Sequence, residues 1–261
     1  MNVMIQQVGQ GAAQRGIAYL RGTATGSPGL VWLSGFKSDM VSTKASAVAA
    51  FAEAQGAAML RFDYSGHGQS DGDFAEGTIS AWLEETLALI TAQTSGPQIL
   101  VGSSMGGWLA LLAARALAAR GEAGRLAGMV LIAPAVDFTQ ALLWPRLPEA
   151  VRHEIMTRGV WLRENAYGPE PMPISKKLIL DGAQNLLMTA PLRSHGPVHI
   201  LQGMRDEDVP FSHAQALVAL LAHDEVTLTL VPDGDHRLSR DEDIALLLAT
   251  IAGMRANTRP A

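Results

Sequence analysis

The chain has 261 residues, of which 48% are hydrophobic and 17% charged. That is enough apolar sequence for a sizeable core, in one large α/β domain or two small ones. Cysteine is absent, which excludes disulfides, thiolate catalysis and cysteine-ligated metals. A net charge of −5 and the lack of a basic run argue against a surface for nucleic acid or an anionic membrane.

The N-terminal stretch "MNVMIQQVGQGAAQRG" has no cationic segment followed by an apolar one, so it lacks the pattern of a secretory signal. Nowhere does the sequence contain an uninterrupted apolar run of about 18 residues, the length that spans a bilayer. We therefore expect a cytoplasmic protein.

Short apolar runs recur along the chain, and the inner ones are continuous rather than alternating. Strands that helices cover on both faces have this pattern, which is typical of a parallel sheet. The expected strands are Ile17–Thr23, Leu30–Ser34, Ala57–Asp63, Gln98–Gly102, Met129–Ala133, Val198–Gln202 and Val226–Val231.

Segments with helical spacing lie between these strands. The expected helices are Thr43–Ala54, Thr78–Thr91, Met105–Ala119, Ser212–Ala222 and Arg240–Met254. Alternation of strands and helices predicts βαβ units with right-handed crossovers, and hence an α/β fold with a mostly parallel central sheet and helices on both faces. We expect residues 1–261 to form a single domain.

Residues 137–191 interrupt this alternation, because they contain no clear β-α unit. We interpret the segment, which is rich in apolar and aromatic residues, as short helices inserted over the sheet. Such an insert is either a packing layer or a lid over a substrate pocket, and its place in the order of elements favours a lid. The side chains expected to line the pocket are Phe138, Leu142, Trp144 and Trp161.

One short motif carries the most specific chemical signal. Gly102-Ser103-Ser104-Met105-Gly106 fits the pattern Gly-x-Ser-x-Gly and stands between an expected strand and an expected helix. A nucleophile exposed at such a sharp turn needs glycine on either side, so that neighbouring backbone can pass closely. We therefore predict Ser104 as the nucleophile, and Ser103 as a small packing residue beside it.

A serine nucleophile needs a base and an acid that orients the base, and in this architecture the chain order is serine, acid, histidine. His236 directly follows the last expected strand, whereas His223 lies at a helix end. The acid should follow the preceding strand, where Asp206 and Asp208 are available. We favour Asp206, which comes first after the turn; Asp208 is the alternative, since its place near a helix start suits a capping role.

The oxyanion of an acyl-transfer intermediate needs two backbone donors. The helix that begins at Met105 supplies one N–H group and its positive dipole end. A second donor is expected from the loop after the first central strand, "WLSGFKSDM", where Gly35 permits an unusual backbone. We therefore predict an oxyanion hole formed by the backbone N–H groups of Phe36 and Met105.

A glycine-rich loop, "RFDYSGHGQSDGDF", covers residues 61–74. Asp63, His67, Asp71 and Asp73 are possible metal ligands, but their spacing matches no metal-site pattern that has a known mechanism. A turn whose aspartates bond to their own backbone explains the composition better. We expect neither a metal nor a cofactor.

Several stretches together resemble the α/β-hydrolase superfamily, over roughly Ile17 to Met254. The matching stretches are "RFDYSGHGQSDGDF", "GPQILVGSSMGGWLALLAA", "RGVW", "LQGMRDEDVP" and "GDHRLS". Within the superfamily the chain looks most like the abhydrolase-domain mitochondrial palmitoyl-protein thioesterases and acyl-glucuronide esterases and their bacterial relatives. Ser34-Gly35 departs from the His-Gly that many members have before the oxyanion loop.

The resemblance implies an α/β-hydrolase fold with a serine triad on Ser104, Asp206 and His236. It also implies activity on acyl thioesters and esters, with acyl glucuronides as a further substrate class. A chain that starts almost at the first strand, without an import sequence, suggests a bacterial cytoplasmic protein. Substrates would be small-molecule esters or acylated proteins.

Two alternatives remain. Hydrolysis of a carbon–carbon bond uses the same three residues, and would need polar groups in the insert to bind the acid end of its substrate. The candidates are Arg146, Arg152, Arg158 and Arg163, which a solvated helix face would also explain. The other alternative is a binding protein that keeps the fold without catalysis.

Overall fold

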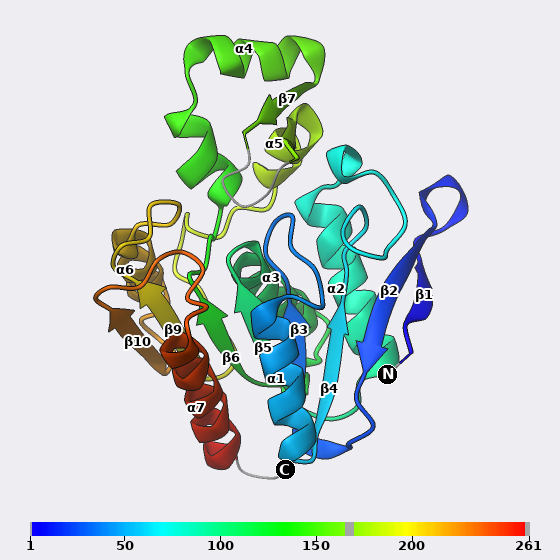
Figure 1. Cartoon of the computed structure of the whole chain (residues 1–261), viewed down its shortest axis with the longest axis vertical. Helices are drawn as coiled ribbons and strands as arrows, with labels where there is room; N and C mark the ends of the chain where they lie inside the picture. Colours follow the sequence, from blue (N-terminus) through cyan, green and yellow to red (C-terminus); the bar gives the residue numbers. More distant parts are fainter. Residues whose placement is uncertain (1, 165–169, 259–261) are drawn as a thin grey trace.

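The structure, a computed structural model, describes residues 2–164 and 170–258. Eight strands form the central sheet in the order β1-β2-β4-β3-β5-β6-β9-β10 (Figure 1). Their bounds are Met4–Val8 (β1), Arg15–Arg21 (β2), Gly26–Leu33 (β3), Ala57–Phe62 (β4), Gln98–Ser103 (β5), Leu126–Ile132 (β6), Val198–Gly203 (β9) and Val226–Val231 (β10). Strands β1 and β2 are antiparallel to their neighbours, and the other pairs are parallel. The mostly parallel sheet predicted from the sequence is thus confirmed.

Strand β1 is absent from the sequence prediction. It pairs with β2 at the edge of the sheet, where Met4 and Ile5 are exposed. Its sequence, MIQQV, has two glutamines in place of a continuous apolar run. Because an edge strand is covered on fewer sides than a central one, it needs no apolar run and leaves no clear signal in the sequence.

Five of the helices cover the two faces of the sheet (Figure 1). They are α1 (Thr43–Ala54), α2 (Ile79–Gln93), α3 (Met105–Ala119), α6 (Phe211–Leu220) and α7 (Asp241–Asn257). Helices α2, α3 and α6 pack on one face, which buries Leu100 and Ile200. Helices α1 and α7 pack on the other, which buries Val101 and Leu201. Neighbouring residues of one strand therefore enter different cores, and this explains the continuous apolar runs.

The insert between β6 and β9 stands above the edge of the sheet at which the parallel strands end (Figure 1). It contains a five-residue π-helical segment (Thr139–Leu143), a short 3-10 turn (Trp144–Arg146), and the helices α4 (Glu149–Arg158) and α5 (Lys176–Gly182). Residues 165–169 of the expected lid lie outside the described residues.

The expectation that this insert contains only short helices was wrong for two segments. Strands β7 (Val160–Arg163) and β8 (Met172–Ser175) pair as an antiparallel hairpin. Gly159, at a φ of 88°, ends α4 in the left-handed conformation that terminates many helices. Valine, tryptophan and leucine follow, and the β-branched and aromatic residues among them favour an extended chain.

Candidate active site

Ser104 lies at a sharp turn between β5 and α3. Its backbone has a φ of 53° and a ψ of −118°, a strained conformation for any residue other than glycine. Two hydrogen bonds hold it there: the Ser104 N–H donates to the Ile132 carbonyl at 2.8 Å, and the Ser104 carbonyl accepts from Ala135 N–H at 3.1 Å. The turn therefore holds the hydroxyl in place at the carboxyl end of the strand.

The two glycines of the motif are required by close backbone contacts. A Cβ at Gly102 would overlap the carbonyl of Gly106, and one at Gly106 would overlap the carbonyl of Leu33. Neither neighbour is a flexible side chain that could move aside. The spacing Gly-x-Ser-x-Gly thus reflects the packing of this turn against α3 and β3.

Three side chains from separate loops form a hydrogen-bonded chain. His236 follows β10, and its Nε2 lies 3.1 Å from the Ser104 hydroxyl oxygen. Its Nδ1 lies 2.8 Å from Oδ2 of Asp206, which follows β9. The Asp206 carboxylate accepts the Nδ1–H hydrogen bond, which leaves Nε2 to accept from the hydroxyl. The structure thus brings together the serine, histidine and acid selected from the sequence.

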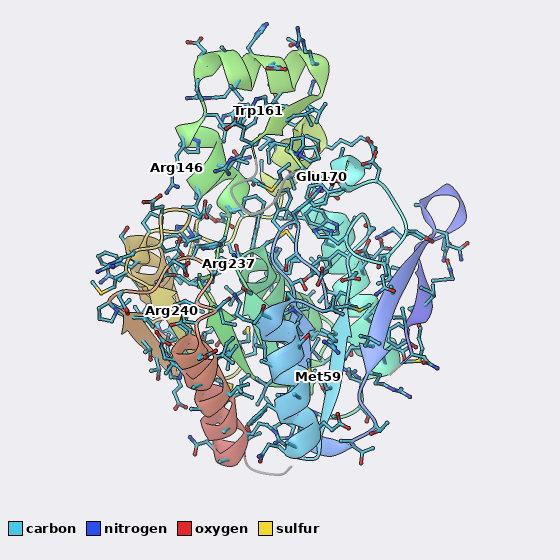
Figure 2. The ribbon with its side chains drawn as sticks, in the orientation of Figure 1. Met59, Arg146, Trp161, Glu170, Arg237 and Arg240 are labelled. Atoms are coloured by element: carbon cyan, nitrogen blue, oxygen red, sulfur yellow. The ribbon has the colours of Figure 1, made fainter. Side chains whose placement is uncertain are left out.

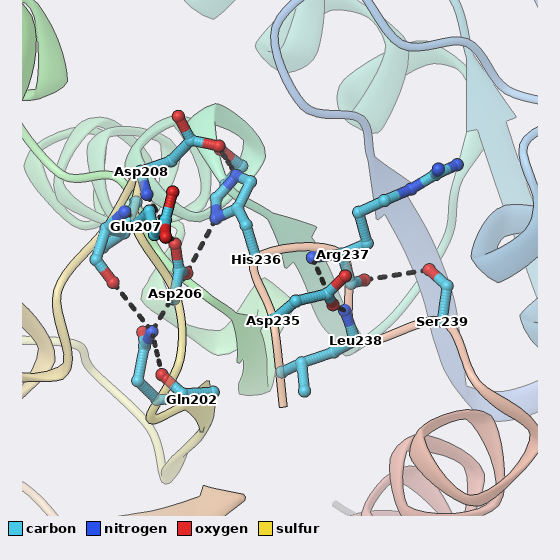
Figure 3. A network of polar contacts seen from close by, with 12 residues as sticks. Gln202, Asp206, Glu207, Asp208, Asp235, His236, Arg237, Leu238 and Ser239 are labelled. Carbon is cyan, nitrogen blue, oxygen red and sulfur yellow. Dashed lines mark hydrogen bonds and ion pairs between the residues drawn. The ribbon is translucent and has the colours of Figure 1, made fainter. Parts of the chain in front are cut away.

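The two acids considered for this position differ in their surroundings. The carboxylate of Asp206 is fully buried, and its Oδ1 accepts from the N–H groups of Asp208 and Val209 at 3.0 and 2.8 Å. Its Oδ2 also accepts from the side-chain amide of Gln202 at 3.1 Å (Figure 3). Asp208 is partly exposed and pairs with Arg163 at 4.0 Å. The buried carboxylate that bonds to Nδ1 of His236 is therefore that of Asp206.

The loop that carries His236 is anchored on both sides of the ring. The Asp235 carboxylate accepts from the N–H groups of Arg237 and Leu238, both at 3.0 Å (Figure 3). From α1, the ammonium of Lys44 donates to the Arg237 carbonyl. Burial lowers the pKa of Lys44 to about 8. Asp235, adjacent to the histidine, thus shapes the turn and leaves the ring to Asp206.

The two backbone groups predicted as oxyanion donors lie beside Ser104. Met105 is the first residue of α3, so no earlier turn of the helix provides an acceptor for its N–H. Gly35 precedes Phe36, and a Cβ on it would lie 3.3 Å from Cβ of Ser104. Within the described part of the chain, the N–H groups of Phe36 and Met105 have no hydrogen-bond acceptor. Both remain available to a ligand.

A mainly apolar cavity of about 380 Å³ opens beside Ser104 and His236. This volume falls in the range of roughly 300–1,000 Å³ that is common for small-molecule sites. Most of the wall comes from the insert. The insert residues among the lining are Phe138, Leu142, Leu143, Arg146, Leu147, Pro148, Trp161, Arg163, Glu164, Met172 and Ile174.

The structure places three of the four expected pocket residues on this wall, namely Phe138, Leu142 and Trp161. The fourth, Trp144, does not line the cavity. It packs against an apolar cluster of the insert, and the guanidinium of Arg152 on α4 lies 6.0 Å from its ring centroid.

Of the four arginines considered as acid-binding groups, Arg146 and Arg163 line the cavity, and Arg163 pairs with Asp208 at 4.0 Å. Arg146 lines the cavity but donates to the carbonyls of Glu207 and Asp208 at 3.0 and 3.1 Å. Arg152 donates to a backbone carbonyl within the insert, and Arg158 pairs with Glu154 on the surface of α4. Figure 2 shows Arg146 at the base of the insert and Trp161 higher within it.

The glycine-rich loop does not gather its acids into one ligand set. Asp63 accepts from the N–H groups of Met40 and Gln69, at 2.6 and 2.8 Å, while Asp71 accepts from Gly16 and Asp73 from Ala75. Among the described residues, the group of three ligand-type side chains that lie within 4.8 Å of one another consists of Asp206, Asp208 and His236. The bonds of Asp63 to Gln69 and of Asp73 to Ala75 are local, as the turn interpretation predicts. The bonds to Met40 and Gly16 instead join the loop to distant segments.

Sequence reasoning missed two residues that hold the site. Gln202, the second-to-last residue of β9, is fully buried and donates to both Asp206 and the Val209 carbonyl. The available signal in the sequence was the side-chain amide of Gln202 near the end of a mostly apolar strand. His67 is buried, and its Nε2 accepts from the Lys37 N–H at 3.1 Å. It was considered only as a metal ligand.

Comparisons with known proteins agree with this fold. The model of the alpha/beta hydrolase family matches residues 24–247. Among curated relatives, the palmitoyl-protein thioesterase ABHD10, mitochondrial, of Homo sapiens is 35% identical over 226 residues, which are 86% of this chain and 72% of the relative. The mouse counterpart is 37% identical over 228 residues.

Two solved structures are similar over nearly their whole length. A putative hydrolase from Agrobacterium vitis S4 has a TM-score of 0.94 and 45% identity, covering 97% of this chain and 98% of that one. The alpha/beta hydrolase domain-containing protein 10 from mouse has a TM-score of 0.81 and 33% identity, covering 96% and 98%. The chain belongs to the alpha/beta hydrolase family. The resemblance drawn from its motifs is therefore confirmed.

Among the residues that the structure describes, none of the helices combines the length and apolar character needed to cross a membrane. The cytoplasmic location expected from the sequence stays a prediction.

Proposed function

We propose that this protein is a serine hydrolase that cleaves carboxylic esters or thioesters through a covalent acyl-enzyme. The observation that carries the proposal is the hydrogen-bonded chain Ser104–His236–Asp206, with distances of 3.1 and 2.8 Å. Such a chain lets a neutral histidine remove the proton of the hydroxyl as the oxygen attacks a carbonyl carbon. The buried carboxylate holds the histidine tautomer and stabilises the imidazolium that forms.

The reaction proceeds in two balanced halves. Oγ of Ser104 attacks the carbonyl carbon, its proton passes to Nε2 of His236, and the same nitrogen then gives the proton to the departing alcohol or thiol. In the second half, water attacks the acyl carbon and loses a proton to Nε2. The bond from the acyl carbon to Oγ then breaks, Nε2 returns the proton to Oγ of Ser104, and the acid is released. In both halves the negative oxygen of the tetrahedral intermediate is stabilised by the N–H groups of Phe36 and Met105.

The acyl group of the substrate is the part that fits the cavity. Phe138, Leu142 and Trp161 make its wall apolar next to Ser104. Burial of a methylene group contributes about 0.8 kcal/mol, which corresponds to roughly a fourfold gain in kcat/KM for each added methylene until the cavity is filled. We therefore propose that residues 137–191 act as a lid with an acyl-binding face. We also propose that all 261 residues form one catalytic domain.

The names of the relatives support the bond type. The curated relatives are called palmitoyl-protein thioesterases, and acyl-protein thioesters combine a long apolar chain with a sulfur leaving group. Hydrolysis of a carbon–carbon bond is less well supported, since the two candidate arginines on the cavity wall already have partners. Arg146 donates to two backbone carbonyls, and Arg163 pairs with Asp208 at 4.0 Å.

The experiment that tests the proposal combines covalent labelling with turnover. The purified protein is treated with a fluorophosphonate probe, and the modified peptide is identified by mass spectrometry. We expect one label on Ser104, together with hydrolysis of acyl p-nitrophenyl esters and acyl thioesters. A folded protein that takes no label and cleaves none of these substrates would favour a binding protein without catalysis.

Leu142→Trp is expected to shift the acyl-length preference. The larger ring would occupy part of the cavity wall, so kcat/KM for decanoyl or longer esters should fall by about tenfold or more, while that for acetyl esters stays within about threefold. The matched control is Leu180→Trp, at a leucine that is 48% exposed on α5 and does not line the cavity. An equal loss for all chain lengths would contradict the acyl-pocket assignment.

A further inference from the structure

The glycine-rich loop after β4 has no part in the reaction described above, yet it bonds directly to the loop that carries Phe36. Two hydrogen bonds connect them: Nε2 of His67 accepts from Lys37 N–H at 3.1 Å, and Oδ1 of Asp63 accepts from Met40 N–H at 2.6 Å. The bond from Met40 to Asp63 stabilises the far end of the Phe36 loop. The bond from Lys37 to His67 restrains the residue immediately after the oxyanion donor.

The Phe36 loop is a tight turn in an uncommon conformation. The Ser38 N–H donates to the Gly35 carbonyl at 3.1 Å, so Phe36 and Lys37 are its two central residues. Lys37 has a φ of 60°, whereas Phe36 is not among the residues with positive φ. A positive φ at the second central residue is the pattern of a type II turn, which normally has glycine there. A lysine at this position favours the competing type I turn.

The two turn types differ in the peptide between Phe36 and Lys37. The plane of this peptide is reversed between the two types. The Lys37 N–H therefore points to one side of the loop in a type I turn and to the opposite side in a type II turn. An acceptor that meets the N–H on one side therefore selects one turn over the other. Nε2 of His67 is that acceptor here.

The His67 ring is held so that Nε2 keeps its lone pair. Nδ1 lies 3.2 Å from the Ser65 carbonyl and donates to it, which fixes the proton on Nδ1. The ring packs between the aromatic rings of Tyr64, Phe74 and Trp82, with centroid distances of 5.6, 4.9 and 5.2 Å. Burial lowers the pKa of His67 to about 4, so the ring is neutral at ordinary pH.

Two of these aromatic rings, those of Phe74 and Trp82, also contact the Phe36 loop. The Phe36 ring lies 4.8 Å from that of Phe74 and 5.9 Å from that of Trp82. The side chain and the following peptide of Phe36 are thus both restrained by one cluster. Oxyanion donors act only when they are held close to the position of the developing charge, so such restraint bears directly on rate.

We propose that His67 is a positioning residue for the oxyanion hole: its Nε2 holds the peptide that follows Phe36 in the type II turn, and so restrains the loop that presents the Phe36 N–H to the reacting carbonyl. The inference rests on the proposed function of Ser104 and the two backbone donors. It assigns the glycine-rich loop a role in transition-state stabilisation rather than in metal binding.

The test uses two replacements with opposite chemistry. His67→Phe keeps a ring among its aromatic neighbours but removes the acceptor, whereas His67→Gln retains an acceptor that reaches about as far. We expect H67F to lower kcat by about tenfold to hundredfold with KM within about threefold, and H67Q to recover most of the loss. Inhibition by an acyl trifluoromethyl ketone, which forms an oxyanion on the serine, should weaken in H67F by the same factor as kcat/KM.

A second variant tests the turn itself. Glycine adopts positive φ freely, so Lys37→Gly should favour the type II turn without His67. We expect K37G to stay within about threefold of the wild type by itself and to restore much of the lost kcat when added to H67F. His199→Phe serves as the matched control, because His199 lies on β9 and its Nε2 bonds to Thr229 at 2.8 Å, away from the site.

The outcomes separate this inference from the proposed function. A folded H67F protein with kcat within about threefold of the wild type would overturn the inference, and so would a loss carried by KM or a K37G change that rescues nothing. Unchanged activity in Ser104→Ala would instead overturn the proposed function. Should H67F fail to fold, H67Q still decides, because a loss of kcat by tenfold or more in a folded variant that retains the acceptor would contradict the selected turn.

Discussion

Replacing Ser104 by alanine is expected to lower kcat/KM for ester hydrolysis by about 10⁴- to 10⁶-fold, since the serine, histidine and acid act as one unit. The residual rate over water would come from the oxyanion donors and the cavity. Initial rates with acyl p-nitrophenyl esters at matched enzyme concentration measure the loss. The hydroxyl lies 3.1 Å from Nε2 of His236, so the same bond is lost when the histidine is replaced.

The control for this loss is the neighbouring serine of the motif. Ser103 ends β5, and we expect Ser103→Ala to retain kcat/KM within about threefold. The double variant Ser104→Ala, His236→Ala should be no slower than Ser104→Ala by itself, since residues that act as a unit are not additive. A Ser103→Ala loss as large as that of Ser104→Ala would contradict the assignment of the nucleophile.

Asp206→Asn is expected to lower kcat by about 10³- to 10⁴-fold with little change in KM. An amide can donate to Nδ1 of His236, which would place the proton of the ring on Nε2 and leave no base for Ser104. The cause is therefore the wrong tautomer rather than lost packing. Steady-state kinetics with a saturating ester measure the effect, and circular dichroism confirms that the variant is folded.

Asp208→Asn is the matched comparison, two residues further along the same loop. Its carboxylate is partly exposed, pairs with Arg163 at 4.0 Å and lines the cavity, so we expect a loss of less than about tenfold, mainly in KM. If the two changes proved equal, or if Asp208→Asn were the more harmful, the acid would have to be reassigned.

The regular elements were largely predictable from local pattern. Continuous apolar runs predicted the inner strands because both faces of the sheet are covered by helices. The bounds of α1, α3 and β10 agree with the prediction to the residue. Strand β1 was missed, and the β7–β8 hairpin was taken for helix, because each depends on a single neighbouring strand and has no strong pattern of its own.

For the candidate site too, local pattern predicted some residues, and tertiary packing decided between others. Ser104 could be selected from its two glycines, because the turn that needs them is local. The sequence favoured Asp206 over Asp208 but left both open, and the difference in their surroundings arises from tertiary packing: the side chain of Asp206 is fully buried beside Gln202 and His236, while that of Asp208 is 36% exposed.

The sequence by itself therefore determined the order of the inner strands and of the helices that cover them, the sharp turn at the serine, and the loops on which acid and base had to lie. These follow from periodicity and from glycine sterics, which act between residues close in the chain. Only the tertiary structure decided which acid meets His236, that Trp144 does not line the cavity, and that His67 bonds to the loop of Phe36. Such contacts join residues far apart in sequence, and spacing along the chain carries no information about how closely their side chains approach.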